Sequence, residues 1–338
     1  MKRRTKRAKV PLRVSFGGGG TDVAPYYKER GGLVLSCTID KYAYGTIRKT
    51  DDHSVTIHSL DFDIQVKYDI SEEIRIEGEL ALVKAVLKHF KLKDGVEIFL
   101  HSDAPPGSGL GSSSAIATLV IGLLSAYTRS PMTDYEIAEL AYQVERKELK
   151  IAGGKQDQYA CTFGGMNMIE FRADATIVNP LRVPRPVLND LEYNLLLCYT
   201  GKTRLSGGLI DKQIERYKSG VDDTIAAMDE LKSLAYQMKD AILRGKLKKF
   251  GELLHASGES KRRMNPHAYP DHIVNAYKTA LENGAIGGKI LGAGAGGYLL
   301  LYVDFDRRRG LVRALESIDI IPVDFHLDYK GLQVWDSE

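Results

Sequence analysis

The chain has 338 residues, and its 47 Lys and Arg against 44 Asp and Glu give a formal net charge of +3. This near balance argues against a protein that coats a nucleic acid. The contents of 43% hydrophobic and 27% charged residues exclude global disorder and a membrane bundle. At roughly 150 residues per domain, the length predicts about two domains. We therefore expect a globular protein that binds neither nucleic acid nor membrane.

The cysteines Cys37, Cys161 and Cys198 are odd in number and lie in largely apolar runs. This pattern favours buried thiols over a disulfide framework or a zinc site, and it predicts a reducing, cytoplasmic setting. Six of the first ten residues are basic, but no apolar segment follows them, so a secretory signal is not expected.

The first part of the chain alternates short segments rich in β-branched and aromatic residues with Gly and Asp-Asp turns. These segments predict strands over residues 9–16, 33–39, 42–49, 55–59 and 64–68. A helix is then expected over 79–90, a strand over 96–100, and helices over 112–127 and 134–149. Strands are expected again over 164–171 and 176–178.

Three prolines, Pro180, Pro184 and Pro186, crowd seven residues and predict a linker. They divide the chain into a first domain of residues 1–186 and a second of 187–338. The second domain is expected to contain a strand over 193–199, three or four helices between 208 and 283, strands over 289–291 and 298–303, a helix over 307–317, and a strand over 322–327. Because strands and helices mix without regular βαβ alternation, an α+β fold is favoured.

The strongest motif, Pro-Pro-Gly-Ser-Gly-Leu-Gly-Ser-Ser-Ser, runs from Pro105 to Ser114, between a predicted strand and a predicted helix. Glycines let backbone N–H groups turn toward an anion, and a helix N-terminus adds partial positive charge, so the motif predicts a phosphate loop. It is not a Walker A loop, because Gly-Lys-Ser/Thr is missing at the required spacing. A plain turn with Ser112 as helix cap does not explain three glycines at alternate positions.

Two further glycine clusters lie far apart in the chain. Gly17 to Gly20 follow Arg13 on a predicted strand and precede Asp22, which either accepts sugar hydroxyl hydrogen bonds or serves as a turn residue. Gly292 to Gly297 match G-x-G-x-x-G, but a strand-like segment follows where a dinucleotide site requires a helix. That second cluster is therefore a loop for close backbone approach or a tight turn.

The run Gly153-Gly154-Lys155-Gln156-Asp157 lies downstream of Glu145 on a predicted helix. A carboxylate near Lys155 is suited to orient or deprotonate a hydroxyl group, and a Glu145 oxygen is a suitable ligand for Mg²⁺. Glu145 is equally compatible with a surface charge beside its basic neighbours.

These four clusters, in this order, resemble the GHMP kinases. The motif from Pro105 to Ser114 is similar to the family's ATP loop, and Gly292 to Gly297 look like its C-terminal glycine motif. The resemblance covers residues 10–303 and implies an N-terminal domain like ribosomal protein S5 domain 2 and a ferredoxin-like C-terminal domain. It places the active site between the two domains.

The resemblance also implies roles for individual residues, with ATP and Mg²⁺ as cofactors. Asp157, Arg13 and Lys155 would act at the reacting groups, and Ser113 and Glu145 would bind Mg²⁺. The ATP phosphates are expected on Pro106, Gly107, Ser108, Gly109, Leu110, Gly111, Ser112 and Ser113. The substrate is expected on Gly18, Gly19, Gly20, Thr21, Asp22, Arg204 and Gly294.

The run from Pro11 to Asp22 resembles both the heptose 7-phosphate branch and the fucose salvage branch of the family, and the run from Tyr199 to Arg204 together with the chain length favours the heptose branch. This implies phosphorylation of the anomeric hydroxyl of D-glycero-D-manno-heptose 7-phosphate to the 1,7-bisphosphate, with another sugar such as L-fucose as the alternative acceptor. The sugar phosphate is the expected partner, and a homo-oligomer is left open. A non-catalytic ATP sensor is disfavoured, because such a protein does not need the acceptor-side carboxylate of Asp157.

Overall fold

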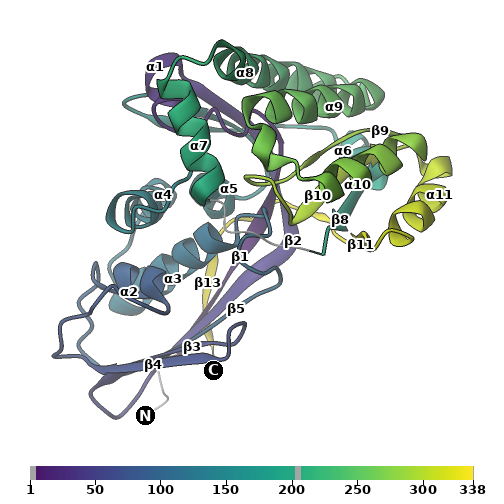
Figure 1. The fold of residues 1–338 in the computed structure, drawn as a ribbon. Helices are drawn as coiled ribbons and strands as arrows, with labels where there is room; N and C mark the ends of the chain where they lie inside the picture. The colour runs from purple at the N-terminus through teal and green to yellow at the C-terminus, as the bar shows by residue number, and fades with distance from the viewer. Residues whose placement is uncertain (1–4, 202–206, 338) are drawn as a thin grey trace.

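The computed structural model describes residues 5–201 and 207–337. Figure 1 shows a long twisted sheet with helices along it and, beside it, a smaller sheet with its own helices. The larger sheet contains nine strands, β1 (Thr5–Gly17), β2 (Gly32–Lys49), β3 (Ser54–Ser59), β4 (Ile64–Asp69), β5 (Val96–Ser102), β6 (Met166–Phe171), β7 (Thr176–Pro180), β12 (Leu327–Asp328) and β13 (Gln333–Ser337).

The centre of this sheet is the antiparallel pair of β1 and β2, which are bonded along most of their length. β2 is one continuous strand where the sequence predicted two, and it bonds β6 through its first half and β5 through its second. Along β1, side chains alternate between the two faces. Leu12 and Val14 therefore lie on one face, and Arg13 and Ser15 on the other; all four are buried.

The helices of the first half are α1 (Tyr26–Arg30), α2 (Ala81–Leu87), α3 (Ser112–Thr128), α4 (Asp134–Tyr142) and α5 (Gln156–Phe163). α3 is apolar on nearly every side because it is buried against β1 and β2. α4 begins with a capping box between Thr133 and Glu136. Its last turn widens into a π-helix, η1 (Gln143–Glu148), within the predicted helix over 134–149.

The smaller sheet contains β8 (Leu195–Tyr199), β9 (Ala285–Ile290), β10 (Tyr298–Val303) and β11 (Ile321–Val323), in the order β11-β8-β10-β9. All pairings in this sheet are antiparallel. Along the chain, helices separate β8 from β9 and β10 from β11, whereas a loop without a helix joins β9 to β10. A β-α-β-β-α-β chain with the fourth strand beside the first is the ferredoxin-like arrangement. The predicted α+β class and ferredoxin-like half are confirmed.

The helices of the second half cover this sheet and the top of the larger one (Figure 1). They are α6 (Arg185–Asn194), α7 (Gly207–Lys218), α8 (Asp222–Leu243), α9 (Leu247–Met264), the 3₁₀ turn η2 (Pro266–Ala268), α10 (Asp271–Glu282) and α11 (Phe305–Glu316). Four helices, α7 to α10, lie in the segment where three or four were predicted.

The proline-rich segment was interpreted as a linker, but part of it starts a helix. Pro184 is the N-cap of α6, and Pro186 lies in its first turn. Backbone N–H groups in the first turn have no partner within the helix, so a proline, which lacks this group, loses no helical hydrogen bond there. The strand predicted over 322–327 is also wrong, because β11 and β12 belong to different sheets.

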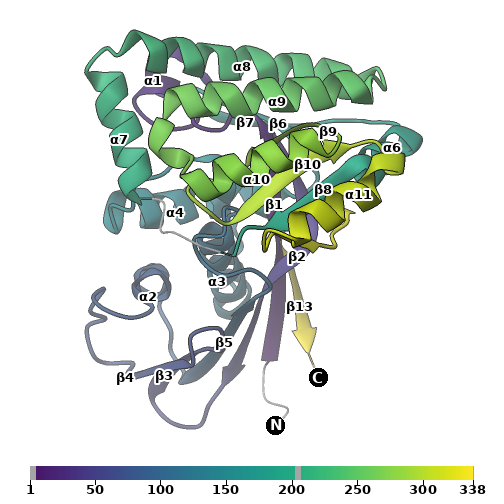
Figure 2. The ribbon, with the colours of Figure 1, turned by 45° about the vertical axis from the view of Figure 1, so that its right-hand side comes forward.

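The last strand, β13, returns to the larger sheet and pairs antiparallel with β1, with Thr5 opposite Ser337. Figure 2 shows the two strands side by side. The sequence did not predict β13, and the domain division at residue 186 stays a prediction. Because β12 also pairs with β2, both ends of the described chain contribute strands to the larger sheet.

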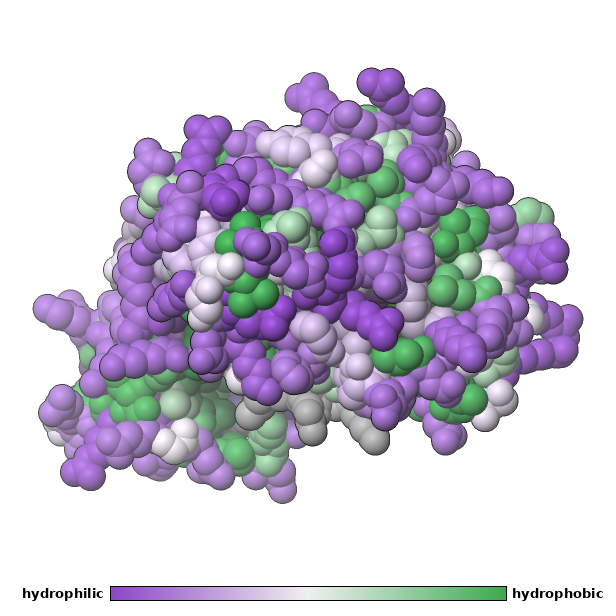
Figure 3. Space-filling view, turned by 45° about the horizontal axis from the view of Figure 1, so that its top comes forward, coloured by the Kyte–Doolittle hydropathy of each residue, from purple (hydrophilic) through white to green (hydrophobic). Residues whose placement is uncertain are grey.

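The three cysteines are buried and free, as predicted. None of the helices in the described residues is long and apolar enough to cross a membrane. The face drawn in Figure 3 is mainly hydrophilic, with hydrophobic residues in small scattered groups.

Candidate active site

A cavity of about 530 Å³ brings the four sequence clusters together. Residues from each cluster line it, including Gly20, Gly109, Asp157 and Gly292. These positions come from the loop after β1, the loop before α3, the start of α5 and the loop between β9 and β10. The cavity therefore lies where both halves of the chain contribute glycine loops.

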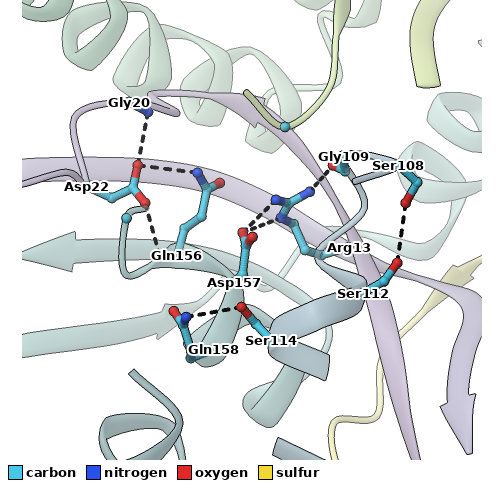
Figure 4. A network of polar contacts seen from close by, with 12 residues as sticks. Arg13, Gly20, Asp22, Ser108, Gly109, Ser112, Ser114, Gln156, Asp157 and Gln158 are labelled. Carbon is cyan, nitrogen blue, oxygen red and sulfur yellow. Dashed lines mark hydrogen bonds and ion pairs between the residues drawn. The ribbon is translucent and has the colours of Figure 1, made fainter. Parts of the chain in front are cut away.

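The centre of the cavity holds an ion pair between β1 and α5. Nε and Nη2 of Arg13 lie 2.7 Å and 2.6 Å from Oδ1 of Asp157, and Nη1 donates to the carbonyl of Gly109 (Figure 4). Arg13 is buried, whereas the Asp157 side chain is 21% exposed. The guanidinium thus holds one carboxylate oxygen in place, and Asp157 remains accessible from the cavity.

The predicted phosphate loop has the backbone that its glycines allow. Gly107, Gly109 and Gly111 have φ angles of 76°, 87° and 83°, a region that favours glycine. Gly111 is the N-cap of α3, so the first N–H groups of that helix face the same loop. Among the predicted ATP contacts, Pro106, Gly107, Gly109, Gly111, Ser112 and Ser113 line the cavity.

Two of the predicted ATP contacts, Ser108 and Leu110, do not line it. Ser108 is buried with its hydroxyl 3.3 Å from that of Ser112, and the carbonyl of Leu110 accepts a hydrogen bond from the backbone N–H of Arg13. Ser108 and Leu110 therefore hold the loop from its buried side.

The loop between β9 and β10 packs directly on the phosphate loop. A Cβ on Gly109 would lie 2.8 Å from the Leu291 carbonyl oxygen, and one on Gly292 would lie 2.4 Å from the Gly109 Cα. The second glycine cluster is therefore a site of close backbone approach, one of the two interpretations left open by the sequence. Gly294 also lines the cavity.

We expect Gly109→Ala to weaken ATP binding about 10-fold or more, because the new methyl group strains a positive φ and displaces the Leu291 carbonyl. Calorimetric titration with ATP measures this. Gly78→Ala is the matched control, since Gly78 has a φ of 70° and nothing within 4 Å. The Gly78→Ala variant is expected to have a lower free energy of unfolding but an unchanged affinity for ATP. An unchanged ATP affinity in Gly109→Ala contradicts the prediction.

Glu145 lies in the π-helix η1 and is fully buried. Its Oε1 accepts a 2.8 Å hydrogen bond from Ser113, and its Oε2 accepts bonds from Ser114 and Gln158. Single π turns inserted in α-helices are frequent at functional sites. The alternative that Glu145 is a surface charge is wrong, because the carboxylate is buried at the start of α3.

The residue set at Glu145 and Ser113 suits Mg²⁺. Two ligands in octahedral coordination lie about 3 Å apart, given metal-oxygen bonds of about 2.1 Å. The 2.8 Å spacing of the two oxygens meets that requirement. Groups of three or more His, Cys, Asp or Glu suited to a metal are absent from residues 5–201 and 207–337. A pair of protein ligands completed by phosphate and water is typical of nucleotide-bound Mg²⁺.

The glycine loop after β1 forms another wall of the cavity. Asp22 is buried, with Oδ1 accepting from the Gly20 N–H at 2.9 Å and Oδ2 from the Gln156 N–H at 3.1 Å (Figure 4). Burial and the nearby Asp157 charge raise the pKa of Asp22, while these N–H donors oppose the rise. Gly19, Gly20 and Asp22 line the cavity, consistent with a hydroxyl-bearing ligand.

Two other predicted substrate residues, Gly18 and Thr21, do not line the cavity. The Thr21 hydroxyl has the carbonyls of Gly18 and Leu33 within hydrogen-bond distance of its one O–H, at 2.7 Å and 3.0 Å, and accepts from the Leu33 N–H, so it joins the loop to β2. Arg204 lies outside the described residues.

Lys155 is also turned away from the cavity. Its ammonium lies 3.3 Å from a Glu139 oxygen and 4.6 Å from the centre of the Tyr142 ring, in a cluster of tyrosines. Lys155 is the N-cap residue of α5, two positions before Asp157, and makes no side-chain cap hydrogen bond. The geometry therefore gives the predicted catalytic role of Lys155 no support.

The sequence analysis assigned no role to several polar residues that line the cavity, among them Gln156, Lys261 and Asn265. Gln156 Oε1 and Asn265 Oδ1 are buried side-chain oxygens without a hydrogen-bond partner in the part of the chain described. Unpaired buried acceptors at a cavity wall are suited to ligand hydroxyl groups. No local motif marks Lys261 or Asn265, because only the packing of α9 brings them to the site.

Known proteins provide an independent comparison. The model of the GHMP kinases N terminal domain matches residues 80–165, and that of the GHMP kinases C terminal matches residues 238–318. The D-glycero-alpha-D-manno-heptose 7-phosphate kinase of Campylobacter jejuni is 36% identical over 98% of this chain and 99% of its own. A bifunctional fucokinase/GDP-fucose pyrophosphorylase of Arabidopsis thaliana is 26% identical over 93% of this chain and 31% of its own.

A solved structure gives the same result in three dimensions. The crystal structure of a D-glycero-D-manno-heptose 1-phosphate kinase from Bacteroides thetaiotaomicron superposes with a TM-score of 0.83 and 33% identity, covering 98% of this chain and 99% of that one. Matches of this length and identity extend across both sheets and all four motifs. The chain belongs to the GHMP kinase family.

Proposed function

We propose that this protein is an ATP-dependent sugar kinase that phosphorylates the anomeric hydroxyl of D-glycero-D-manno-heptose 7-phosphate and forms the 1,7-bisphosphate. The observation that carries this proposal is the full-length similarity, at 36% identity, to a heptose 7-phosphate kinase. The cavity supports it, because a phosphate loop, a buried Arg–Asp pair and a polar wall for hydroxyl groups meet there. We place this reaction in the cytoplasm, where ATP is available.

In this reaction Asp157 accepts a hydrogen bond from the attacking hydroxyl and receives its proton. Arg13 holds the carboxylate and supplies positive charge beside the transferred phosphoryl group. Backbone N–H groups of Gly107 to Ser113 bind the ATP phosphates. Ser113 and Glu145 hold Mg²⁺, which neutralises phosphate charge when bound. Such positioning and charge neutralisation supply most of the catalysis in phosphoryl transfer.

The acceptor wall combines Gly19, Gly20 and Asp22 with the unpaired oxygens of Gln156 and Asn265. Five polar or backbone positions on one side of the cavity suit a polyhydroxylated ring better than an apolar acceptor. The Asp22 carboxylate is already held by backbone donors, so it meets the sugar in a fixed orientation.

ATP consumption with a panel of acceptors tests the proposal. Heptose 7-phosphate is expected to be used with the highest kcat/KM, and fucose, mannose, galactose and mevalonate poorly. Heptose 1-phosphate belongs in the panel because the name of the Bacteroides relative carries a 1-phosphate. Higher activity with any of these compounds than with heptose 7-phosphate contradicts the proposed acceptor.

A fucose kinase is the second candidate, supported by the 26% identity to the bifunctional fucokinase/GDP-fucose pyrophosphorylase of Arabidopsis over 93% of this chain and 31% of that protein. The two candidates differ in the charge of the acceptor. If wild-type protein uses unphosphorylated heptose or fucose as well as heptose 7-phosphate, an anchor for the acceptor phosphate is not needed, and the fucose-type kinase is favoured.

We propose Arg204 as that anchor. The residues that follow it at the start of α7, Gly208 to Ile210, line the cavity. We expect Arg204→Ala to raise KM for heptose 7-phosphate about 30-fold, since a lost charged contact costs roughly 2–5 kcal/mol, and to leave KM for ATP unchanged. Steady-state kinetics measure both. Lys41→Ala is the control, since Lys41 does not line the cavity; an equal effect there contradicts the assignment.

A further inference from the structure

A buried lysine from α9 lines the cavity, and no part of the proposed reaction uses it. Lys261 is 5% exposed and lies in the last turn of α9. Its Nζ donates to the carbonyl of Ile290 at 2.8 Å and to the carbonyl of Gly292. An ammonium group has three N–H donors. Two are therefore taken by backbone carbonyls, which leaves the third for the cavity.

Lys261 differs from the other basic residues that line the described cavity. Arg13 is paired with Asp157, Arg146 has Glu145 at 3.9 Å and donates to a backbone carbonyl, and Lys150 is exposed. Lys261 forms no ion pair with any residue in 5–201 or 207–337. Burying a charge without a counter-ion is costly, so a buried unpaired lysine at a cavity wall is suited to an anionic ligand.

The position of Lys261 favours one particular anion. Gly292, which Lys261 holds, packs on Gly109, whose carbonyl accepts the hydrogen bond from Arg13. One turn along α9, Met264 contacts Gly20 on the acceptor side. Lys261 therefore lies between the ATP loop and the acceptor wall, on the side of Arg13.

We infer that the third N–H of Lys261 binds an oxygen of the transferred phosphoryl group, so that Lys261 is a second cation there beside Arg13. This inference rests on the proposed kinase function and names a residue for the same reaction. The lysine would hold the phosphoryl group from the α9 side while Arg13 holds it from β1.

The electrostatics of the site agree with this assignment. Burial, followed by the charges of Lys289 and Arg13, lowers the pKa of Lys261 well below its usual value. Phosphate oxygens in the cavity favour the protonated form of Lys261, so binding of the phosphate ligand stabilises the positive charge of this side chain.

The test compares two nucleotides that differ in one phosphoryl group. Lys261→Gln keeps N–H donors for the carbonyls and removes the charge. With Mg²⁺ present, this variant is expected to bind a non-hydrolysable ATP analogue about 10-fold more weakly than wild type and ADP with unchanged affinity, by calorimetry. Its kcat is expected to fall about 30-fold with little change in acceptor KM, and Lys261→Arg to restore part of the loss.

Lys289→Gln is the matched control. Lys289 is also a buried lysine, bonded to the Phe16 carbonyl at 3.2 Å, but it does not line the cavity. Its variant is expected to keep the wild-type ratio of analogue to ADP affinity. Equal weakening of both nucleotides by Lys261→Gln, with a lower Tm, overturns the inference and makes Lys261 a structural tie between α9 and the glycine loop.

Two further readouts separate the remaining outcomes. A rise in acceptor KM alone assigns Lys261 to the acceptor and overturns the inference. In wild-type protein, where no variant has to fold, the Lys261 ¹⁵Nζ resonance is expected to shift with the ATP analogue and not with ADP; the same response to both overturns it. The nucleotide comparison needs no sugar, so it tests Lys261 even where the acceptor panel refutes heptose 7-phosphate.

Discussion

Asp157→Asn is expected to lower kcat at least about 100-fold while ATP binding stays close to wild type. Nε and Nη2 of Arg13 both contact Oδ1 of Asp157, so the other carboxylate oxygen is available to the acceptor hydroxyl. An asparagine can still accept the Arg13 bonds through its carbonyl, but it then presents an NH₂ group to the acceptor. That group cannot accept the hydroxyl proton, so the reaction slows without loss of the phosphate loop.

Single-turnover and steady-state rates measure the effect, and calorimetry with ATP measures the binding. Asp211→Asn removes the same charge from an exposed residue that also lines the cavity, and it is the matched control. Its kcat is expected to stay within a small factor of wild type. A near-normal kcat in Asp157→Asn removes Asp157 from the catalytic role.

The glycine loops could be predicted from sequence because their chemistry depends on the residue type itself. Positive φ angles at Gly107, Gly109 and Gly111, and contacts that leave no room for a Cβ at Gly292, are properties that only glycine provides at low cost. Such motifs show in the sequence without any knowledge of the fold. The match between motif and cavity was therefore best for the phosphate loop.

Individual residues within or beside the motifs were predicted less well. Lys155, Thr21 and Leu110 lie within two positions of a cavity residue, yet none of the three lines the cavity. In a loop or at a helix start, neighbouring side chains point in different directions, so closeness in sequence does not give closeness to the ligand. Spacing alone cannot distinguish the residue that faces the ligand from the one behind it.

Long-range packing accounts for most of what the sequence did not show. The pairing of Arg13 with Asp157 spans 144 positions. The family resemblance placed both residues at the reacting groups, but it did not predict the ion pair between them. Lys261 and Asn265 have no motif, and α9 brings them to the cavity only because it packs on β9 and β1. The short helix α5 follows two glycines that indicated a loop, and β13 acquires its strand structure by pairing with β1.

Glu145→Gln is expected to raise the Mg²⁺ concentration for half-maximal activity about 100-fold, with a much smaller effect on acceptor KM. Glu145 Oε1 lies 2.8 Å from the Ser113 hydroxyl, and the carboxylate is the only acidic side chain among the described residues that bonds to the start of α3. A neutral amide is a poor ligand for a hard cation, and its NH₂ group also faces donors where the carboxylate accepted from Ser114 and Gln158.

Activity measured against Mg²⁺ concentration gives the shift, and excess Mg²⁺ is expected to recover part of the rate. Glu139→Gln, which removes a charge from the same helical segment near Lys155, is the control and should keep the wild-type Mg²⁺ curve. If Glu145→Gln loses activity equally at every Mg²⁺ concentration and unfolds at lower temperature, the buried carboxylate only holds α3 to the π-helix, and the metal must be bound elsewhere.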